Sequence, residues 1–224
     1  MEINHKNLST PLEAHQISRS YGSYQAMAET DLELHGGEIT LLSGPNGSGK
    51  TTLLLLLSGL LRPTTGSVKI EGFDLYRDER QAKQRLALVP DVPRFYTELT
   101  AWEHLRFQAL AFSLSESDFE KRAEGYLKEF NLWEARDLFP HNYSRGMRLK
   151  LGLIMALIRP LRVLLLDEPT SALDMEGVEQ LKLHLERLRG MGAAVLLTSH
   201  DPLLGRGLSD RILKLEHGHL EEAM

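Results

Sequence analysis

The apolar and polar positions at the start of the chain follow strand patterns that are interrupted by one helix. Leu12–Tyr21 and Met27–His35 are predicted to be short strands, and Glu38–Ser43 is an apolar run typical of a buried strand. Lys50–Leu61 is rich in leucine and is predicted to be a helix, which the Arg62-Pro63 pair ends. Further strands are predicted at Ser67–Glu71 and Leu86–Val89. The order predicts a β-rich start that alternates sheet and helix.

The middle of the chain, from Pro93 to about Ile158, contains almost no strand pattern and at least three helix patterns. Thr100 with Glu103, and Ser115 with Asp118, each form a capping-box signature at a predicted helix start. We interpret this stretch as a helical subdomain inserted into the fold.

The pattern then returns to alternating strands and helices. Arg162–Leu166 and Ala193–Thr198 are predicted strands, and Asp174–Arg189 is an amphipathic helix. The apolar face of that helix is formed by Val178, Leu181, Leu185 and Leu188. The sequence therefore predicts one α/β domain over residues 1–224, with residues 1–92 and 159–224 forming its core and about 93–158 the helical subdomain.

Composition narrows the class of protein. The chain has 224 residues, of which 42% are hydrophobic and 25% charged, so it has enough apolar residues for a core. Its net charge of -5 argues against nucleic acid as a partner, and the absence of cysteine excludes disulfides and thiolate-bound zinc. The longest apolar runs are too short to span a membrane, and residues 1–11 lack the pattern of an export signal. We therefore expect a cytoplasmic protein.

A glycine-rich stretch after the apolar strand satisfies the pattern G-x-x-x-x-G-K-[ST]. Its backbone amides and the following helix start favour phosphate, the lysine neutralises terminal phosphates, and the threonine hydroxyl can bind Mg²⁺. The alternative is a glycine-rich turn with a surface lysine. The predicted nucleotide-binding residues here are Gly44, Pro45, Asn46, Gly47, Ser48, Gly49, Lys50, Thr51 and Thr52.

Two acidic residues follow a second apolar strand. Asp167 and Glu168 come directly after Val163–Leu166, so they lie at the carboxyl end of a strand, where doubly wound sheets bind ligands. We expect Asp167 to orient Mg²⁺ and Glu168 to act as the general base toward an attacking water. Alone, such a pair could instead be a helix cap.

Three further segments complete the order of motifs. They are Asn142–Met147 before the acidic strand, Pro169–Asp174 after it, and Leu197–Asp201 at the end of the next strand. Over essentially the whole chain this order resembles the nucleotide-binding subunits of ABC transporters. The resemblance implies a P-loop NTPase of the α/β class, with a RecA-like, mostly parallel sheet core, an N-terminal antiparallel β subdomain and an inserted helical subdomain.

The resemblance also assigns roles to single residues. Gly44–Thr51 looks like the Walker A loop, with Lys50 as a catalytic residue, and the 167–168 pair looks like the end of Walker B. Tyr21 matches the aromatic residue that stacks on adenine, although it could be a packed strand-end tyrosine, with Tyr24 as the alternate candidate. His200 resembles the switch histidine, which contacts the γ-phosphate.

The family signature is matched by Ser144–Met147, where Arg145 replaces the second glycine and Met147 the usual glutamine. In the family this helix end, here Ser144 and Gly146, caps the γ-phosphate held by the other subunit. The alternative is a helix cap without a ligand. Ser171–Asp174 looks like the D-loop, and Asp174 is included among the predicted nucleotide-binding residues.

One departure falls in the segment Leu88–Asp91, where the family has glutamine and this chain has Asp91. An ionised carboxylate only accepts hydrogen bonds and is one methylene shorter than glutamine. We predict that Asp91 is a metal ligand together with Thr51 and Asp167; the alternative is a residue that starts the turn before Val92-Pro93.

These features imply an ATP-binding and ATP-hydrolysing subunit that powers transport by separate membrane permeases. Its cofactors are ATP and Mg²⁺, and its partners are a second ABC ATPase subunit and integral membrane permeases at the inner face of the cell membrane. The segment Phe139–Tyr143 and the Gly-Met version of the signature favour export. Phe95, Tyr96 and Leu99 are predicted to dock the permease, unless they are buried in the subdomain core. The alternative function is a non-transport ABC ATPase or an ATP-switched clamp with weak hydrolysis.

Overall fold

The computed structural model describes residues 9–199 and 208–223. Its contacts divide the chain into two compact units. The first consists of Met1–Leu88, Leu161–Glu168 and Leu185–Met224, and the second of Val89–Pro160 and Pro169–His184. The predicted boundaries of the core and the helical subdomain, at about 93 and 158, stay predictions.

The first unit contains an antiparallel sheet with the strand order β2-β1-β4-β5. Strand β2 begins three residues before the predicted Met27, because the pairing with β1 continues to the turn, where Tyr21 faces Tyr24. The pairing of backbone groups extends a strand beyond its apolar residues. The strands are β1 (Leu12–Tyr21), β2 (Tyr24–Leu34), β4 (Thr65–Ile70) and β5 (Phe73–Asp74).

A second sheet in the same unit has the order β10-β9-β3-β8-β7-β6. Strand β3 is parallel to both of its neighbours, β7 is parallel to β8, and only the hairpin strand β10 is antiparallel among the pairings described. The strands are β3 (Ile39–Ser43), β6 (Leu86–Val89), β7 (Val163–Leu166), β8 (Ala194–Ser199), β9 (Arg211–Glu216) and β10 (His219–Glu222). The expected combination of an antiparallel sheet and a mostly parallel sheet is confirmed.

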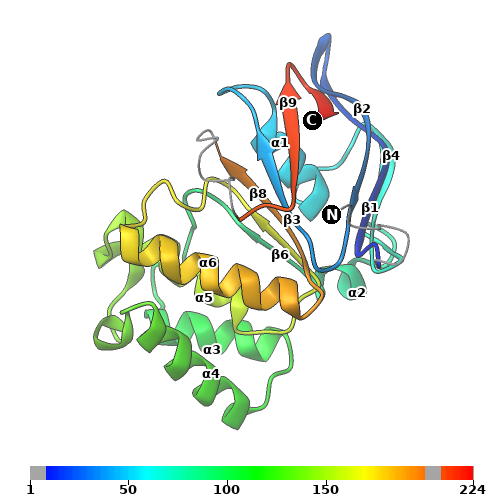
Figure 1. The fold of residues 1–224 in the computed structure, drawn as a ribbon. Coiled ribbons are helices and arrows are strands. Elements are labelled where there is room, and N and C mark those ends of the chain that lie inside the picture. Colours follow the sequence, from blue (N-terminus) through cyan, green and yellow to red (C-terminus); the bar gives the residue numbers. More distant parts are fainter. Residues whose placement is uncertain (1–8, 200–207, 224) are drawn as a thin grey trace. The chain divides into compact units, whose positions relative to one another are not determined.

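Helix α1 (Lys50–Ser58) lies between the two sheets (Figure 1). Its leucines join one apolar core with residues of β1, β2, β4 and the parallel strands. The helix ends before the predicted Leu61, because Gly59 adopts a left-handed conformation at φ 74° and its N–H bonds to the carbonyl of Leu56. Helix α2 (Glu79–Lys83) is a short surface element of this unit.

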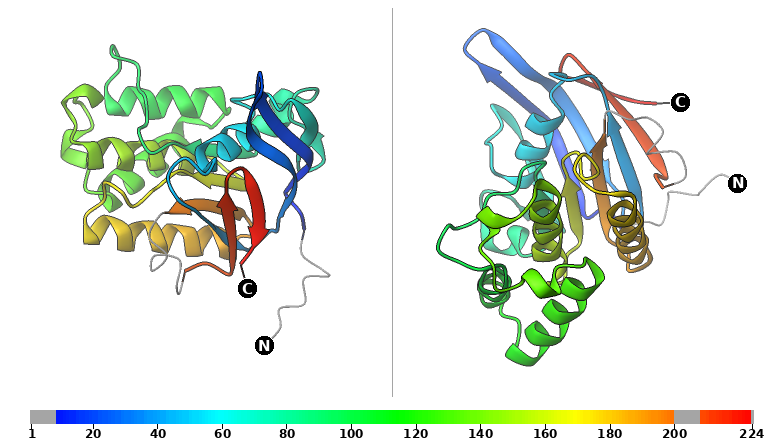
Figure 2. Two further views of the ribbon diagram at one scale, coloured as in Figure 1. Left: turned by 90° about the horizontal axis from the view of Figure 1, so that it is seen from above. Right: turned by 90° about the vertical axis from the view of Figure 1, so that its left-hand side faces the viewer.

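The second unit is helical. Helices α3, α4 and α5 pack against one another (Figure 2). The largest fully buried side chains of this unit are Phe119 and Phe130. The elements are α3 (Ala101–Ala111), α4 (Glu116–Glu129), the 3₁₀ turns η2 (Trp133–Ala135) and η3 (Pro140–Asn142), and α5 (Arg145–Leu157). Helix α6 (Met175–Gly190) begins in this unit and ends in the first. The helical character predicted for this stretch is therefore observed.

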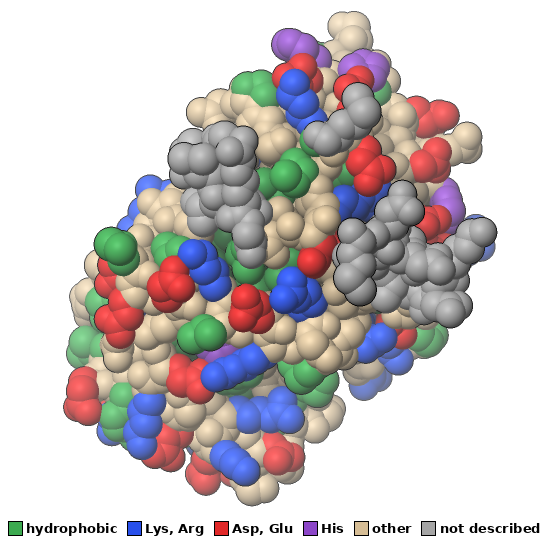
Figure 3. Space-filling view, in the orientation of Figure 1, with side chains coloured by type: hydrophobic (Ala, Val, Ile, Leu, Met, Phe, Trp, Pro, Cys, Tyr) green, Lys and Arg blue, Asp and Glu red, His purple; other side chains and the backbone are tan. Residues whose placement is uncertain are grey.

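Surface charge is mixed. On the face drawn in Figure 3, Lys and Arg side chains are interspersed with Asp and Glu side chains. This face therefore differs from the single-sign stripe of a nucleic-acid-binding surface. Within residues 9–199 and 208–223, none of the helices combines the length and the apolar character that crossing a membrane requires.

Candidate functional site

The glycine-rich loop joins the end of β3 to the start of α1. A side chain at Gly44 would collide with the backbone carbonyl of Leu215 in β9. Gly49 has φ 109°, and a Cβ there would lie 3.2 Å from the carbonyl oxygen of Ala26 in β2. The loop therefore runs so close to two strands that only glycine fits at these positions.

The start of α1 has polar groups suited to an anion. Gly49 precedes the helix and provides no side-chain cap, and the first N–H groups of any helix have no partner within that helix. The hydroxyl of Ser48 is buried and has no hydrogen-bond partner in the part of the chain that the structure describes. Pro45, Asn46 and Gly47 form the exposed side of the loop. The residues present fit the phosphate groups of a nucleotide.

Lys50 begins α1, with only 7% of its surface exposed. Its Nζ donates to the carbonyl oxygens of Gly44 and Pro45 at 2.7 and 3.3 Å, and lies 3.9 Å from Glu168 Oε1. The ammonium is thus held by the loop itself, close to the carboxylate of Glu168, two residues after the end of β7. Thr52, in the first turn of the helix, is half-buried.

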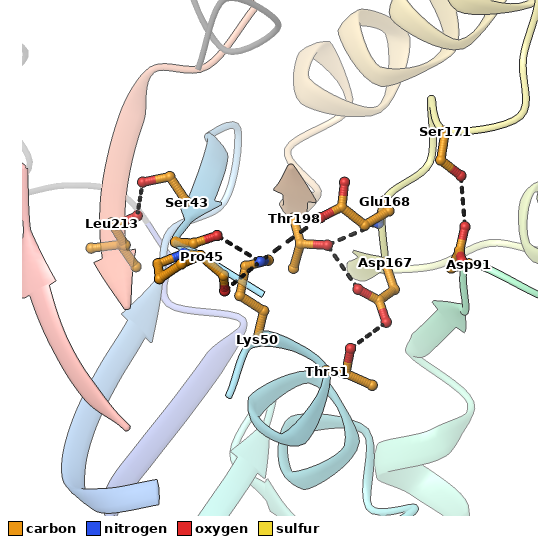
Figure 4. A network of polar contacts seen from close by, with 11 residues as sticks. Ser43, Pro45, Lys50, Thr51, Asp91, Asp167, Glu168, Ser171, Thr198 and Leu213 are labelled. Carbon is orange, nitrogen blue, oxygen red and sulfur yellow. Dashed lines mark hydrogen bonds and ion pairs between the residues drawn. The ribbon is translucent and has the colours of Figure 1, made fainter. Parts of the chain in front are cut away.

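The acidic end of β7 meets the start of α1, as Figure 4 shows. Thr51 Oγ1 donates to Asp167 Oδ2, and Thr198 Oγ1 from β8 donates to Asp167 Oδ1, each at 2.8 Å. Asp167 is 7% exposed, so its carboxylate is held in place by two hydroxyls. This set of oxygen atoms suits a small divalent cation such as Mg²⁺.

Glu168 adopts a left-handed backbone conformation, with φ 47°. Its N–H donates to Thr198 Oγ1 at 2.8 Å, and its carboxylate is the one near Lys50. Thr198 therefore joins both acidic residues: it accepts from the backbone of one and donates to the side chain of the other. Thr198 is a functional residue that was not predicted from the sequence, although it lies in the segment Leu197–Asp201 that was.

Tyr21 and Tyr24 face each other at the end of the β1–β2 hairpin. Tyr21 is half exposed, and the guanidinium of Arg19 lies 4.4 Å from the centroid of its ring. Tyr24 is two residues before Ala26, the residue that borders the loop at Gly49. Tyr21 is therefore an exposed tyrosine and not a packed core residue, and its contact with adenine stays a prediction.

In the second unit, Ser144 caps α5, because its hydroxyl accepts the N–H of Met147 at 3.2 Å. A Cβ at Gly146 would lie 2.7 Å from the carbonyl oxygen of Ala172, so the backbones of the two segments are in close contact. Asp174 accepts the N–H of Gly177 and pairs with Lys150 at 3.4 Å. The hydrogen bond from the Gly177 N–H holds the pKa of Asp174 below its ordinary value, and the Lys150 charge adds a smaller effect in the same direction.

Asp91 also lies in the second unit, and both of its carboxylate oxygens are engaged. Arg145 donates to them at 2.7 and 3.0 Å, and the Ser171 hydroxyl donates to Oδ1 at 2.6 Å. The predicted role of Asp91 as a metal ligand stays a prediction. The remaining predicted residue, His200, lies outside the described residues.

The three residues predicted to dock a permease differ in exposure. Tyr96 is 59% exposed, and its ring packs on those of His104 and Phe107 at 6.0 and 5.7 Å between centroids. Phe95 and Leu99 are half-buried. Val92, Phe107 and Leu110 are further exposed apolar residues of this unit.

Comparison with known proteins identifies the family. Residues 27–171 match the profile of the ABC transporter family. The SkfA peptide export ATP-binding protein SkfE of Bacillus subtilis is 30% identical over 209 residues, which are 93% of this chain and 87% of that protein. The cobalt import ATP-binding protein CbiO of Rhodobacter capsulatus is 34% identical over 203 residues, 89% of this chain and 72% of that protein.

A solved dimeric structure of a bacterial ABC transporter cassette superposes with a TM-score of 0.85 at 26% identity, over 94% of this chain and 98% of that one. The chain spans 66% to 98% of the length of its Bacillus subtilis and Porphyromonas gingivalis relatives. These relatives include proteins named for export and for import. The chain therefore belongs to the ABC transporter family, as one of its ATP-binding and ATP-hydrolysing subunits.

Proposed function

We propose that this subunit hydrolyses Mg²⁺-ATP in a dimer and drives export through separate membrane permeases. The observation that carries the proposal is that the start of α1 and the acidic residues after β7 are in contact. Lys50 Nζ lies 3.9 Å from Glu168 Oε1, and Thr51 Oγ1 donates to Asp167 Oδ2 at 2.8 Å. A cation for phosphate, an oxygen ligand for metal and a candidate base are the parts that phosphoryl transfer to water requires.

Each part has a proposed task. The amides of Gly44–Thr52 and the ammonium of Lys50 bind the phosphates of ATP. Thr51 and Asp167 would hold Mg²⁺, which neutralises charge on the phosphates when bound. Glu168 accepts a proton from the attacking water, and Thr198 holds the backbone of Glu168 so that this carboxylate stays near Lys50. Tyr21 stacks on the adenine ring.

The dimer supplies the remaining contacts. Ser144, Gly146 and Asp174 of one subunit complete the site of the other, and His200 contacts the γ-phosphate. The capped start of α5, which presents N–H groups to an anion, and the dimeric form of the similar bacterial cassette support this assignment.

The partner on the membrane side is a permease, which binds the exposed apolar residues around Tyr96 and holds the subunit at the inner face of the membrane. Export is favoured by the signature variant Ser144–Met147 and by the similarity to SkfE. Co-expression with candidate permeases and a transport assay in vesicles would test the direction.

The decisive experiment replaces the proposed base. The wild-type chain should hydrolyse ATP, and Glu168→Gln should bind ATP normally but turn over about 10²- to 10⁴-fold more slowly. It should also accumulate as an ATP-bound dimer in size-exclusion chromatography. The control is Glu186→Gln, which changes an exposed residue of α6 and should leave turnover unchanged. Near-normal turnover of Glu168→Gln would exclude Glu168 as the base, and an inactive wild type would favour an ATP-switched clamp.

A further inference from the structure

Two of the three departures of this chain from the family pattern, Arg145 and Asp91, are in contact with each other. Arg145 stands where the signature has glycine, Asp91 stands where the family has glutamine, and the two form an ion pair at 2.7 Å. Ser171 joins them: its hydroxyl donates to Asp91 at 2.6 Å (Figure 4). The same hydroxyl accepts from Arg145 at 3.2 Å. These three residues are 26 to 80 positions apart in the sequence.

Each member of the pair compensates for the other. Arg145 is the first residue of α5, where a positive charge opposes the helix dipole. The Asp91 carboxylate supplies the negative charge that this helix end favours. Conversely, Arg145 donates to both oxygens of Asp91, a geometry that a glutamine at position 91 could not provide.

The pair belongs to a row of contacts that hold the segment 171–177 on α5. After Ser171, the backbone of Ala172 is in close contact with Gly146, and Asp174 pairs with Lys150 at 3.4 Å. Arg145, Gly146 and Lys150 follow one another along α5 in the same order as their partners Ser171, Ala172 and Asp174 follow one another along the segment. The segment is therefore fixed to α5 at three successive points.

Just before this segment lies the proposed base. Glu168 precedes Ser171 by three residues, and its φ of 47° is a strained backbone conformation for a residue with a side chain. Such a conformation persists only where the surroundings impose it. On one side the N–H of Glu168 is held by Thr198, and on the other the carbonyl of Thr170 accepts the N–H of Leu173 and the Ser171 hydroxyl donates to Asp91.

We propose that Asp91 and Arg145 are a positioning pair for Ser171. By fixing the chain three residues after Glu168, they hold the backbone of Glu168 in the conformation that hydrolysis requires. This inference rests on the proposed function, in which Glu168 activates water. It assigns to Asp91 a positioning role that is distinct from metal binding.

A double-mutant cycle tests the pair. The turnover number and KM for ATP are measured for the wild type, Asp91→Asn, Arg145→Gln and the double variant. Each single change should lower kcat about three- to tenfold, which is the size expected for a partly exposed ion pair in which Arg145 donates to both carboxylate oxygens of Asp91. KM should stay within about twofold of the wild-type value. The double variant should be no slower than the slower single variant, because both remove the same interaction.

The matched control is the exposed ion pair between Arg106 and Glu116, at 2.8 Å in the same unit. Arg106→Gln and Glu116→Gln should leave kcat unchanged. Thermal unfolding shows whether each variant is folded. If the single variants are unfolded, the charge swap Asp91→Arg with Arg145→Asp decides: recovery of kcat to within about threefold supports the pair, and failure to recover contradicts it.

Three results would overturn the inference: effects that multiply in the double variant, a change in KM without a change in kcat, or an equal loss in the control pair. Failure of the proposed function is distinguishable from these. It would appear as an inactive wild type or as normal turnover of Glu168→Gln, whatever the outcome of the cycle.

Discussion

Replacing Thr198 with valine tests the organisation of the candidate site most directly. Valine has nearly the same shape as threonine but lacks the hydroxyl. Thr198 is completely buried, so no water can take over the two hydrogen bonds that its hydroxyl makes. The change leaves the N–H of Glu168 and one oxygen of the Asp167 carboxylate without these partners.

The expected loss can be worked from these two bonds. A hydrogen bond to a charged group contributes about 1.5–3 kcal/mol, and an unpaired buried backbone N–H costs about 1–3 kcal/mol. We expect Thr198→Val to lower the free energy of unfolding by about 3–5 kcal/mol. For a chain of this size, 1 kcal/mol corresponds to about 2–4 °C, so Tm should fall by roughly 10 °C.

Thr198→Ser is the matched control, because it keeps the hydroxyl and loses only a methyl group, worth about 1 kcal/mol. Calorimetry without nucleotide measures Tm for both variants, and steady-state assays measure kcat. The serine variant should remain close to the wild type in both. A valine variant that melts within about 3 °C of the wild type, or a serine variant as unstable as the valine variant, would refute the reasoning.

Three further predictions concern the rest of the chain. Tyr96→Ala should weaken co-purification with a permease and leave Tm nearly unchanged, because the ring is mostly exposed; loss of folding without selective loss of binding would favour a core role. Asp91→Gln should need the same Mg²⁺ concentration for half-maximal ATPase activity as the wild type, because Asp91 is engaged by Arg145 and Ser171, and a relaxed requirement would instead indicate a metal ligand. Burial, aided by the charge of Asp137, raises the pKa of Tyr143 from 10.0 to about 12. The folded state therefore favours the protonated phenol, so this contribution to stability is present below pH 10 and is lost as the pH rises to about 12. Denaturant unfolding across that range should show the loss in the wild type and not in Tyr143→Phe.

The sequence predicted those parts of the site that lie immediately after a single apolar strand in the chain. The loop between β3 and α1, and the acidic residues after β7, each occupy a few consecutive positions with an apolar strand before them. Parallel strands bring such ends to one edge of a sheet, which is why Thr51 and Asp167 meet although they are 116 positions apart.

At the two helix starts with a capping-box pattern, the length of the acidic side chain decides whether the second, reciprocal hydrogen bond forms. Thr100 and Glu103 form both bonds of a capping box. At α4, Ser115 accepts the N–H of Asp118, but the shorter aspartate side chain bonds to the Ser115 hydroxyl and not to its backbone N–H. The pattern predicted both helix starts correctly, and the reciprocal bond forms only where glutamate provides the reach.

Contacts between positions far apart in the sequence were not predicted. Thr198 serves Glu168 from 30 residues away, and Arg145 reaches Asp91 across 54. The residues next to Thr198 and Arg145 in the sequence do not show whether the Thr198 hydroxyl or the Arg145 guanidinium bonds to a distant residue or to water. The unusual residues at 91 and 145 were visible separately as departures, and only the fold shows that they belong together.

The position of β3 in its sheet has a consequence for synthesis of the chain. Its parallel neighbours β8 and β9 come much later in the sequence, and Ile39 pairs with Val195. While the ribosome is still adding those residues, the backbone N–H and C=O groups along both edges of β3 have no partners from this sheet. Late pairing of this kind slows folding and leaves strands open to aggregation. A nascent chain that stalls before β9 would therefore be prone to aggregate, and shortened fragments should be recovered mainly in the insoluble fraction.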